Sequence, residues 1–215
     1  MKKLKALFLA VTMGCVILTS CAPKKVQKSP IEEINDKLMT METYGCIADL
    51  TYISNKGENT YKTKQYYRTT GEYRVEMIAP EEVKGLVTVY DGEKVMQYNP
   101  RINGEVIDEI PESKNRNEIF LGVFLKNYLQ SEEVTLEVFN INDEEYSVLE
   151  AVIPEGGKYL ATEKLWVSNK TLEPNKLIVY DIEGKERIIV KYEQFKYNIK
   201  LEDRIFRISK SNEGQ

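Results

Sequence analysis

The chain has 215 residues, of which 30 are basic and 34 acidic, so its formal net charge is −4. This acidic balance argues against nucleic-acid binding, because a phosphate backbone requires a basic surface. The chain contains no histidine, so it lacks the commonest general base and the commonest zinc ligand, which removes most of the support for a hydrolase or a metalloenzyme.

The first twenty residues have the pattern of an export signal. Three lysines lie among the first five residues, and residues 6–18 form an apolar run that is too short to span a bilayer comfortably. The sequence Leu-Thr-Ser-Cys that ends at Cys21 resembles the bacterial lipobox, at which cleavage between Ser20 and Cys21 leaves an acylated cysteine as the mature N-terminus. The alternative is one uncleaved transmembrane helix, which Pro23 makes awkward.

An acylated Cys21 predicts binding to a lipid bilayer, since palmitate-like acyl chains contribute about 0.8 kcal/mol per buried methylene. Residues 21–29 contain three lysines and little apolar surface, so we interpret them as a flexible lipidated tether that favours an anionic membrane surface. Residues 30–215 are expected to form a single domain, because a chain of this length can close a substantial core. The predicted location is the extracytoplasmic face of a cell membrane.

The predicted elements begin with a helix over residues 30–41, where apolar residues recur at helical spacing and two glutamates occupy the first turn. From Tyr44 the apolar period changes to two, and strand-like runs alternate with turns, of which Asp91-Gly92 is the clearest hairpin. Residues 119–129 predict a second helix with a broad apolar face. About ten mainly antiparallel strands result, so the expected fold is α+β, a strongly curved antiparallel sheet wrapped around two or more helices.

Cys46 is the only thiol that remains in the mature domain once Cys15 is removed and Cys21 is acylated, so an intrachain disulfide is excluded. Cys46 shares one face of its predicted strand with Ala48 and Leu50. We expect it to be a small buried apolar residue, because free cysteine is among the most buried residue types. The alternative is an intermolecular disulfide.

Two long segments resemble LolA-type lipoprotein-carrier domains. Residues 71–102 pass from a strand containing arginine through a proline and a glycine to a hairpin that ends in tyrosine, and residues 164–198 contain the later motifs YDIEGK and YEQFKYN. The resemblance covers nearly all of the mature chain and implies a LolA/LolB-like half-barrel. With the lipobox included, the chain is most similar to the germination lipoprotein GerS family of clostridial spore formers.

The resemblance to the GerS family implies a protein that binds a zinc-dependent N-acetylmuramoyl-L-alanine amidase and makes it active on spore cortex peptidoglycan. It also implies anchoring in the forespore intermembrane space and a role in sporulation and germination. No sequence motif brings together a serine and a lysine or a pair of carboxylates, so we expect a protein without enzymatic activity and without a cofactor. Whether the chain forms a homodimer stays open.

The alternative function is a carrier or sensor of lipids or lipoproteins that uses an apolar cavity between the sheet and the helices. Aromatic side chains would line such a cavity or an interface, because they combine a large apolar area with a polar tip. They are also ordinary half-buried sheet residues, and a helix over 119–129 is more commonly a cover for the sheet than a lid. The candidate binding or cavity residues are Phe120, Phe124, Trp166, Tyr90 and Tyr98.

The lipid anchor is testable by replacing the acylated residue. The substitution Cys21→Ala should abolish the incorporation of labelled fatty acid and leave an unlipidated precursor, because the lipobox cysteine is the acyl acceptor. Metabolic labelling and immunoblotting of membrane fractions measure both effects. Persistent labelling of the variant would contradict the anchor.

Overall fold

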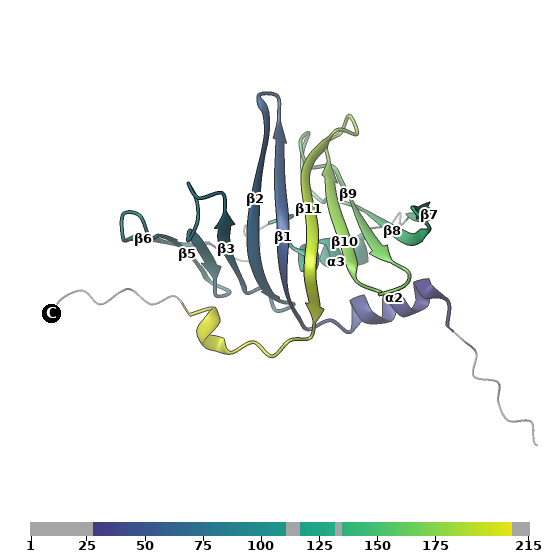
Figure 1. Cartoon of the computed structure of the whole chain (residues 1–215), viewed down its shortest axis with the longest axis horizontal. Coiled ribbons are helices and arrows are strands. Elements are labelled where there is room, and N and C mark those ends of the chain that lie inside the picture. The colour runs from purple at the N-terminus through teal and green to yellow at the C-terminus, as the bar shows by residue number, and fades with distance from the viewer. Residues whose placement is uncertain (1–27, 111–116, 132–134, 208–215) are drawn as a thin grey trace, which may run out of the picture.

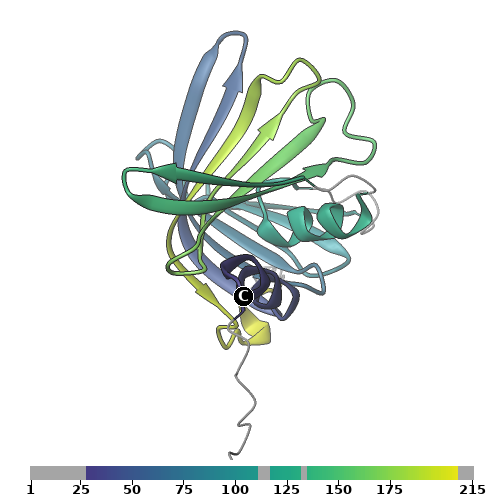
Figure 2. The same ribbon diagram turned by 90° about the vertical axis from the view of Figure 1, so that its right-hand side faces the viewer.

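The computed structural model describes residues 28–110, 117–131 and 135–207, so the predicted signal and Cys21 lie outside the described residues. Within these ranges the chain forms one open antiparallel sheet of eleven strands and two helices that lie on its concave side (Figures 1 and 2). The elements in chain order are α2 (Pro30–Met39), β1 (Thr43–Ser54), β2 (Gly57–Arg68), β3 (Tyr73–Ala79), β4 (Val87–Tyr90), β5 (Lys94–Asn99), β6 (Gly104–Glu109), α3 (Leu121–Gln130), β7 (Thr135–Ile141), β8 (Glu144–Val152), β9 (Thr162–Ser168), β10 (Pro174–Tyr180), β11 (Glu186–Tyr197) and the short 3-10 helix η2 (Asp203–Ile205).

The sheet consists of two meanders that join at its centre. The strand order is β6-β5-β4-β3-β2-β1-β11-β10-β9-β8-β7, so the first and last strands of the chain pair with each other, for example Leu50 opposite Val190. The curved antiparallel sheet with helices is the α+β architecture that the sequence predicts. The prediction of about ten strands falls one short. The predicted helices 30–41 and 119–129 correspond to α2 and α3, with the start of α2 as predicted and the other three ends shifted by one or two residues.

Helix α2 begins where its sequence supplies a capping box. The backbone N–H of Ser29 donates to a carboxylate oxygen of Glu32 at 2.7 Å, and the backbone N–H of Glu32 donates to the Ser29 hydroxyl at 3.4 Å. These two bonds satisfy donors that the first helical turn leaves without partners. Ile34 and Leu38 are the buried residues of the helix and face the core.

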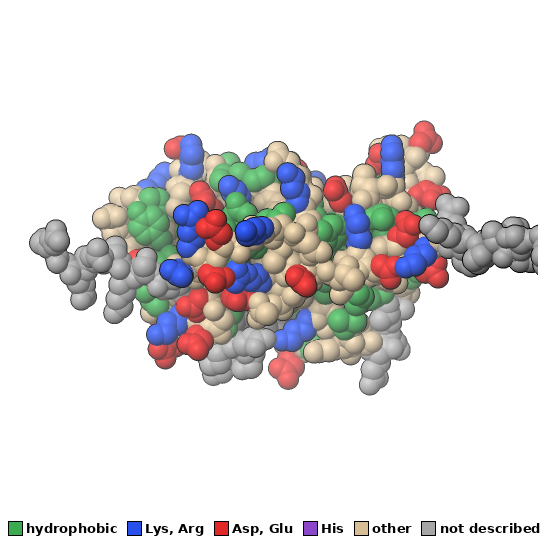
Figure 3. All heavy atoms as spheres, turned by 90° about the horizontal axis from the view of Figure 1, so that it is seen from below, with side chains coloured by type: hydrophobic (Ala, Val, Ile, Leu, Met, Phe, Trp, Pro, Cys, Tyr) green, Lys and Arg blue, Asp and Glu red, His purple; other side chains and the backbone are tan. Residues whose placement is uncertain are grey.

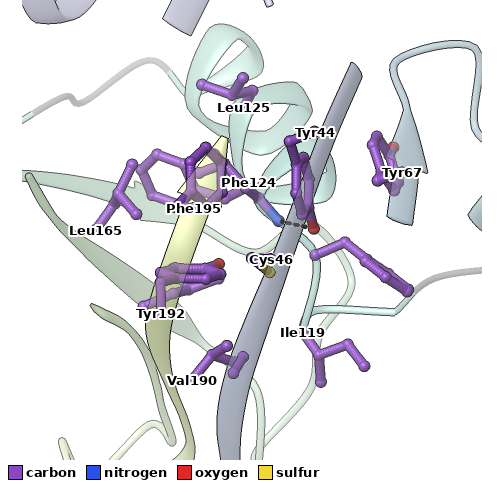
Figure 4. Packing of buried hydrophobic residues seen from close by; sticks show 14 of the residues in the cluster. Tyr44, Cys46, Tyr67, Ile119, Phe124, Leu125, Leu165, Val190, Tyr192 and Phe195 are labelled. Atoms are coloured by element: carbon purple, nitrogen blue, oxygen red, sulfur yellow. Dashed lines mark hydrogen bonds between the residues drawn. The ribbon is translucent and has the colours of Figure 1, made fainter. Parts of the chain in front are cut away.

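The concave side of the sheet holds the main core, which includes both helices (Figure 4). Along β1 the side chains alternate as expected, with Cys46, Ala48 and Leu50 at 5% exposure or less. Aromatic rings connect neighbouring strands across this face: Tyr44 on β1 stacks on Tyr67 at a centroid distance of 5.6 Å and on Phe195 of β11 at 5.0 Å. The centre of the core is therefore filled with side chains.

Helix α3 obtains its N-terminal hydrogen bond from the sheet. Its N-cap residue, Phe120, supplies no side-chain cap, and the backbone N–H of Leu121 instead donates to the Tyr44 hydroxyl oxygen at 3.3 Å in a buried position (Figure 4). An uncapped helix start buried without a partner would cost free energy. Tyr44 thus attaches the central strand to the helix that covers it.

The convex side of strands β2–β5 carries a smaller core, which the sequence analysis did not anticipate. The segment after β11 crosses this face and places Phe206 against Val89 and Met96. The guanidinium of Arg68 holds the segment, because it donates to the Leu201 carbonyl oxygen at 2.9 Å and pairs with the Asp203 carboxylate at 2.7 Å. Residues far apart in the sequence therefore close the second face of the sheet.

Removal of the Tyr44 hydroxyl tests the attachment of α3. The substitution Tyr44→Phe should lower the free energy of unfolding by about 1–3 kcal/mol, because it leaves the Leu121 N–H buried without an acceptor. Tyr52→Phe on the same strand, at a residue that is 40% exposed, should have little effect and serves as the control. Urea denaturation measures both variants, and equal stability of Tyr44→Phe and wild type would contradict this role.

Candidate functional site

A groove lies at the lower rim of the molecule, between the C-terminal end of α2, the end of β2 and one side of α3. Its volume is about 620 Å³, which is within the range of small-molecule sites. Six of the twelve lining residues are apolar, four are polar and two are glycines: Leu38, Met39, Thr40, Met41, Glu42, Tyr67, Thr69, Gly71, Gly122, Leu125, Lys126 and Leu129.

The groove exposes apolar side chains that a core would normally bury. Met39 is 45% exposed and Leu129 is 65% exposed. Figure 3, which shows the molecule from below on the side where α2 lies, shows apolar atoms exposed between charged side chains. Gly122 brings α3 close to the Tyr67 ring, since a Cβ at this position would lie 2.0 Å from a ring carbon. The groove is therefore a surface feature at the edge of a tightly packed core.

Three of the five candidate aromatic residues lie together in the main core on the concave side. Tyr90, Phe120 and Phe124 have exposures of 1% or less. Phe120 packs on Tyr73 at a centroid distance of 4.5 Å, and Tyr73 packs on Tyr90 at 5.6 Å. Their rings fill the space between the sheet and α3, where the lipid-carrier alternative requires a cavity.

The other two candidates, Tyr98 and Trp166, lie on the convex side. Tyr98 packs against the smaller core, whereas Trp166 lies on β9 between Leu165 and Val167, which face the main core. The five candidates therefore do not meet in one site.

Trp166 belongs to a second aromatic cluster, on strands β7–β10. Its ring packs on Phe139 at a centroid distance of 5.0 Å and meets Tyr146 edge-on at 6.4 Å. The ammonium of Lys176 lies 4.1 Å from the Trp166 ring centroid, a distance at which a cation is attracted to the ring face. This cluster ties the edge strand β7 to the rest of the sheet.

Several polar groups buried on the concave side bond to one another, whereas the buried Tyr192 hydroxyl has no hydrogen-bond partner among the described residues. Cys46 contacts the Gln65 side-chain oxygen at 3.9 Å, the Gln65 amide donates to the Thr63 hydroxyl at 3.2 Å, and that hydroxyl donates to the Ala48 carbonyl oxygen at 3.0 Å. Near α3, the Asn127 amide donates to a Glu163 carboxylate oxygen at 2.7 Å. Such networks stabilise one arrangement of the core.

Burial keeps the Cys46 thiol and two tyrosine hydroxyls of this core protonated. It raises the pKa of the Cys46 thiol well above its usual value, and it also raises the pKa of the Tyr44 and Tyr192 hydroxyls. A thiol or phenol with a raised pKa is a poor nucleophile and a poor base at neutral pH. These residues therefore act in packing.

The described residues contain neither a metal-binding cluster nor a membrane-spanning helix. No group of three or more histidine, cysteine, aspartate or glutamate side chains there is arranged to hold a metal ion. No helix in the same part of the chain has the length and apolar character needed to cross a membrane.

The chain matches a known protein-family model over nearly its whole length. Residues 1–206 match the model described as sporulation protein YdcC-like. The sporulation protein YdcC of Bacillus subtilis (strain 168) is 20% identical over 208 residues, which cover 96% of this chain and 61% of that protein. The chain thus spans about three fifths of the length of this relative.

Two solved structures extend the comparison. A chain in the structure of the CwlD amidase from Clostridioides difficile in complex with the GerS lipoprotein is 32% identical, with 81% of this chain and 99% of that chain covered and a TM-score of 0.49. The LolA superfamily protein NE2245 from Nitrosomonas europaea is 15% identical, with 85% and 99% covered and a TM-score of 0.44. The similarities to GerS and to LolA-type proteins that the sequence predicts are therefore found.

The burial of Cys46 is testable by thiol labelling of a Cys21→Ser variant that lacks the signal, so that Cys46 is the only thiol. Its reaction with a bulky maleimide should be slow in the native protein and fast in urea, because the side chain is 5% exposed and its pKa is raised. Mass spectrometry follows the modification with time. Fast labelling of the native protein, or a dimer that reductant dissociates, would contradict burial.

Proposed function

This chain belongs to the family of YdcC-like sporulation proteins, and from this premise we propose that it is a lipid-anchored extracytoplasmic protein that binds and activates a cell-wall amidase. In this proposal the amidase supplies the catalytic groups and the metal. The chain supplies binding energy and holds its partner at a membrane surface.

The observation that carries the proposal is the 32% identity to a chain of the complex between the CwlD amidase and the GerS lipoprotein, with 99% of that chain covered. An identity of this size over a whole chain is a sequence relation and does not rest on the similarity of shape. The partner that we infer is accordingly an N-acetylmuramoyl-L-alanine amidase of the spore cortex.

The chemistry of the described residues is in accord with a binding protein. The thiol of Cys46 and the phenols of Tyr44 and Tyr192 are buried and kept protonated, so they offer no reactive group to a substrate. Exposed apolar side chains lie instead at the rim and at an edge of the sheet, where a protein partner has access to them.

The anchoring part of the proposal rests on the sequence before the described residues. The lipobox cysteine Cys21 and the lysines that follow it would hold the domain at an anionic membrane surface. Helix α2 starts at Pro30, directly after this tether, so the folded domain would lie close to the membrane. The site of action would be the space between the two forespore membranes.

A second candidate function is the binding of a lipid or of an acylated protein, and the groove between α2 and α3 favours it. The groove has a volume of about 620 Å³ and exposes Met39 and Leu129. It lies at the rim and is open to solvent, so a bound acyl chain would remain partly exposed to water. The partner function therefore takes precedence.

The proposed function predicts a complex and a phenotype. The purified protein should form a stable complex with the amidase of its own organism and release nothing from peptidoglycan alone, as measured by size-exclusion chromatography and muropeptide analysis. A deletion strain should form spores whose cortex lacks muramic-lactam and which germinate poorly, and the wild-type gene should restore both properties. Normal lactam content in the deletion strain would contradict the proposal.

A further inference from the structure

Strand β7 is an edge strand with one free side among the described residues. Only β8 pairs with it, and all seven of its residues are exposed. Natural proteins usually protect such edges with lysine, proline or a covering segment, because a free apolar edge pairs readily with another chain. The β7 sequence, TLEVFNI, contains neither lysine nor proline. Its large apolar residues are Leu136, Val138, Phe139 and Ile141, with exposures of 45%, 61%, 38% and 43%.

The apolar residues of β7 lie on both faces of the sheet. Leu136 is opposite Leu149, whose side chain is in the main core, so it lies on the concave side together with Val138. Phe139 lies on the convex side and packs on Trp166 at 5.0 Å. A strand added alongside β7 would therefore find apolar neighbours on both of its faces, in addition to the free backbone groups of the edge.

The hairpin formed by β7 and β8 is acidic. Residues 135–152 contain five acidic residues and no basic one, and the whole stretch from 127 to 157 has no lysine or arginine. Glu150 is paired with Lys164 at 3.1 Å, whereas Glu137 and Glu145 are exposed on the hairpin. A segment that binds here is attracted if it is basic and repelled if it is acidic.

The charge distribution also argues against a second copy of this chain at β7. Pairing of β7 with β7 would bring two acidic hairpins together. The opposite edge of the sheet, β6, has the sequence GEVIDE, with three acidic residues and no basic one. Like charges on adjacent strands are destabilising, so both pairings within a homo-oligomer are disfavoured.

We propose that β7 is the docking edge for a basic, extended segment of the partner protein, which adds to the sheet next to β7. The backbone of β7 supplies hydrogen bonds to the added strand. The apolar side chains supply burial, and the acidic hairpin selects for lysine and arginine. The identification of that partner as the amidase rests on the proposed function.

The test places a lysine on each edge strand of the full-length protein in detergent. Val138→Lys on β7 and Val106→Lys on β6 are matched, because the two valines are 61% and 60% exposed and both strands lie at an edge. Val138→Lys should weaken binding of the amidase about tenfold or more, since it places a cation where a basic segment binds. Val106→Lys should change the affinity by less than about twofold.

A peptide probe examines the same edge without the amidase. A short labelled peptide of alternating valine and lysine should bind the wild type and Val106→Lys, should bind Val138→Lys about tenfold or more weakly, and should lose affinity as salt is added. The control peptide, of alternating valine and glutamate, should not bind. Fluorescence anisotropy measures the affinities, and circular dichroism confirms that both variants are folded.

The amidase-binding and peptide-binding experiments together distinguish a failure of this inference from a failure of the proposed function. If the amidase binds wild type and Val138→Lys equally, the β7 inference is overturned and the proposed function stands. If the amidase does not bind the wild type, the proposed function fails, and the peptide decides: selective binding to an intact β7 supports the docking edge, and no binding overturns it.

Discussion

The structure depends on the position of one buried tyrosine on the central strand. Tyr44 stacks on Tyr67 of the first meander and on Phe195 of the second, and its hydroxyl accepts the hydrogen bond that helix α3 does not obtain from its own N-cap. Strand β1 is where the two meanders meet. The same side chain therefore connects both halves of the sheet with the helix on its concave side.

A consequence of this packing is that the described residues at the centre of the concave side are closely packed. The rings of Phe120 and Phe124 are fully buried there, and the polar groups of Gln65 and Asn127 bond to neighbouring side chains. Exposed apolar side chains that other molecules can contact lie at the periphery, in the groove beside α3 and along the edge strands.

The positions of the aromatic candidate residues could be predicted only in part from the sequence. Phe120 and Phe124 were expected near the concave side because they lie on one face of a predicted helix, and they do line it. Trp166 and Tyr98 are aromatic residues on strands, as the aromatic residues of the core strands are, yet they lie on the other side of the sheet. Alternation along a strand separates two faces, but it does not say which face meets the helices, because that depends on the curvature of the whole sheet.

The sequence by itself determined the features that local interactions decide. The start of α2 follows from its capping box, and the burial of Cys46 and Leu50 follows from a period of two. Only the tertiary structure decided that β1 pairs with β11 and that the segment ending at Phe206 covers the convex face. These contacts join residues far apart in the chain, and their free energy is gained only when the whole sheet has formed. They therefore cannot be predicted from any short stretch of the sequence.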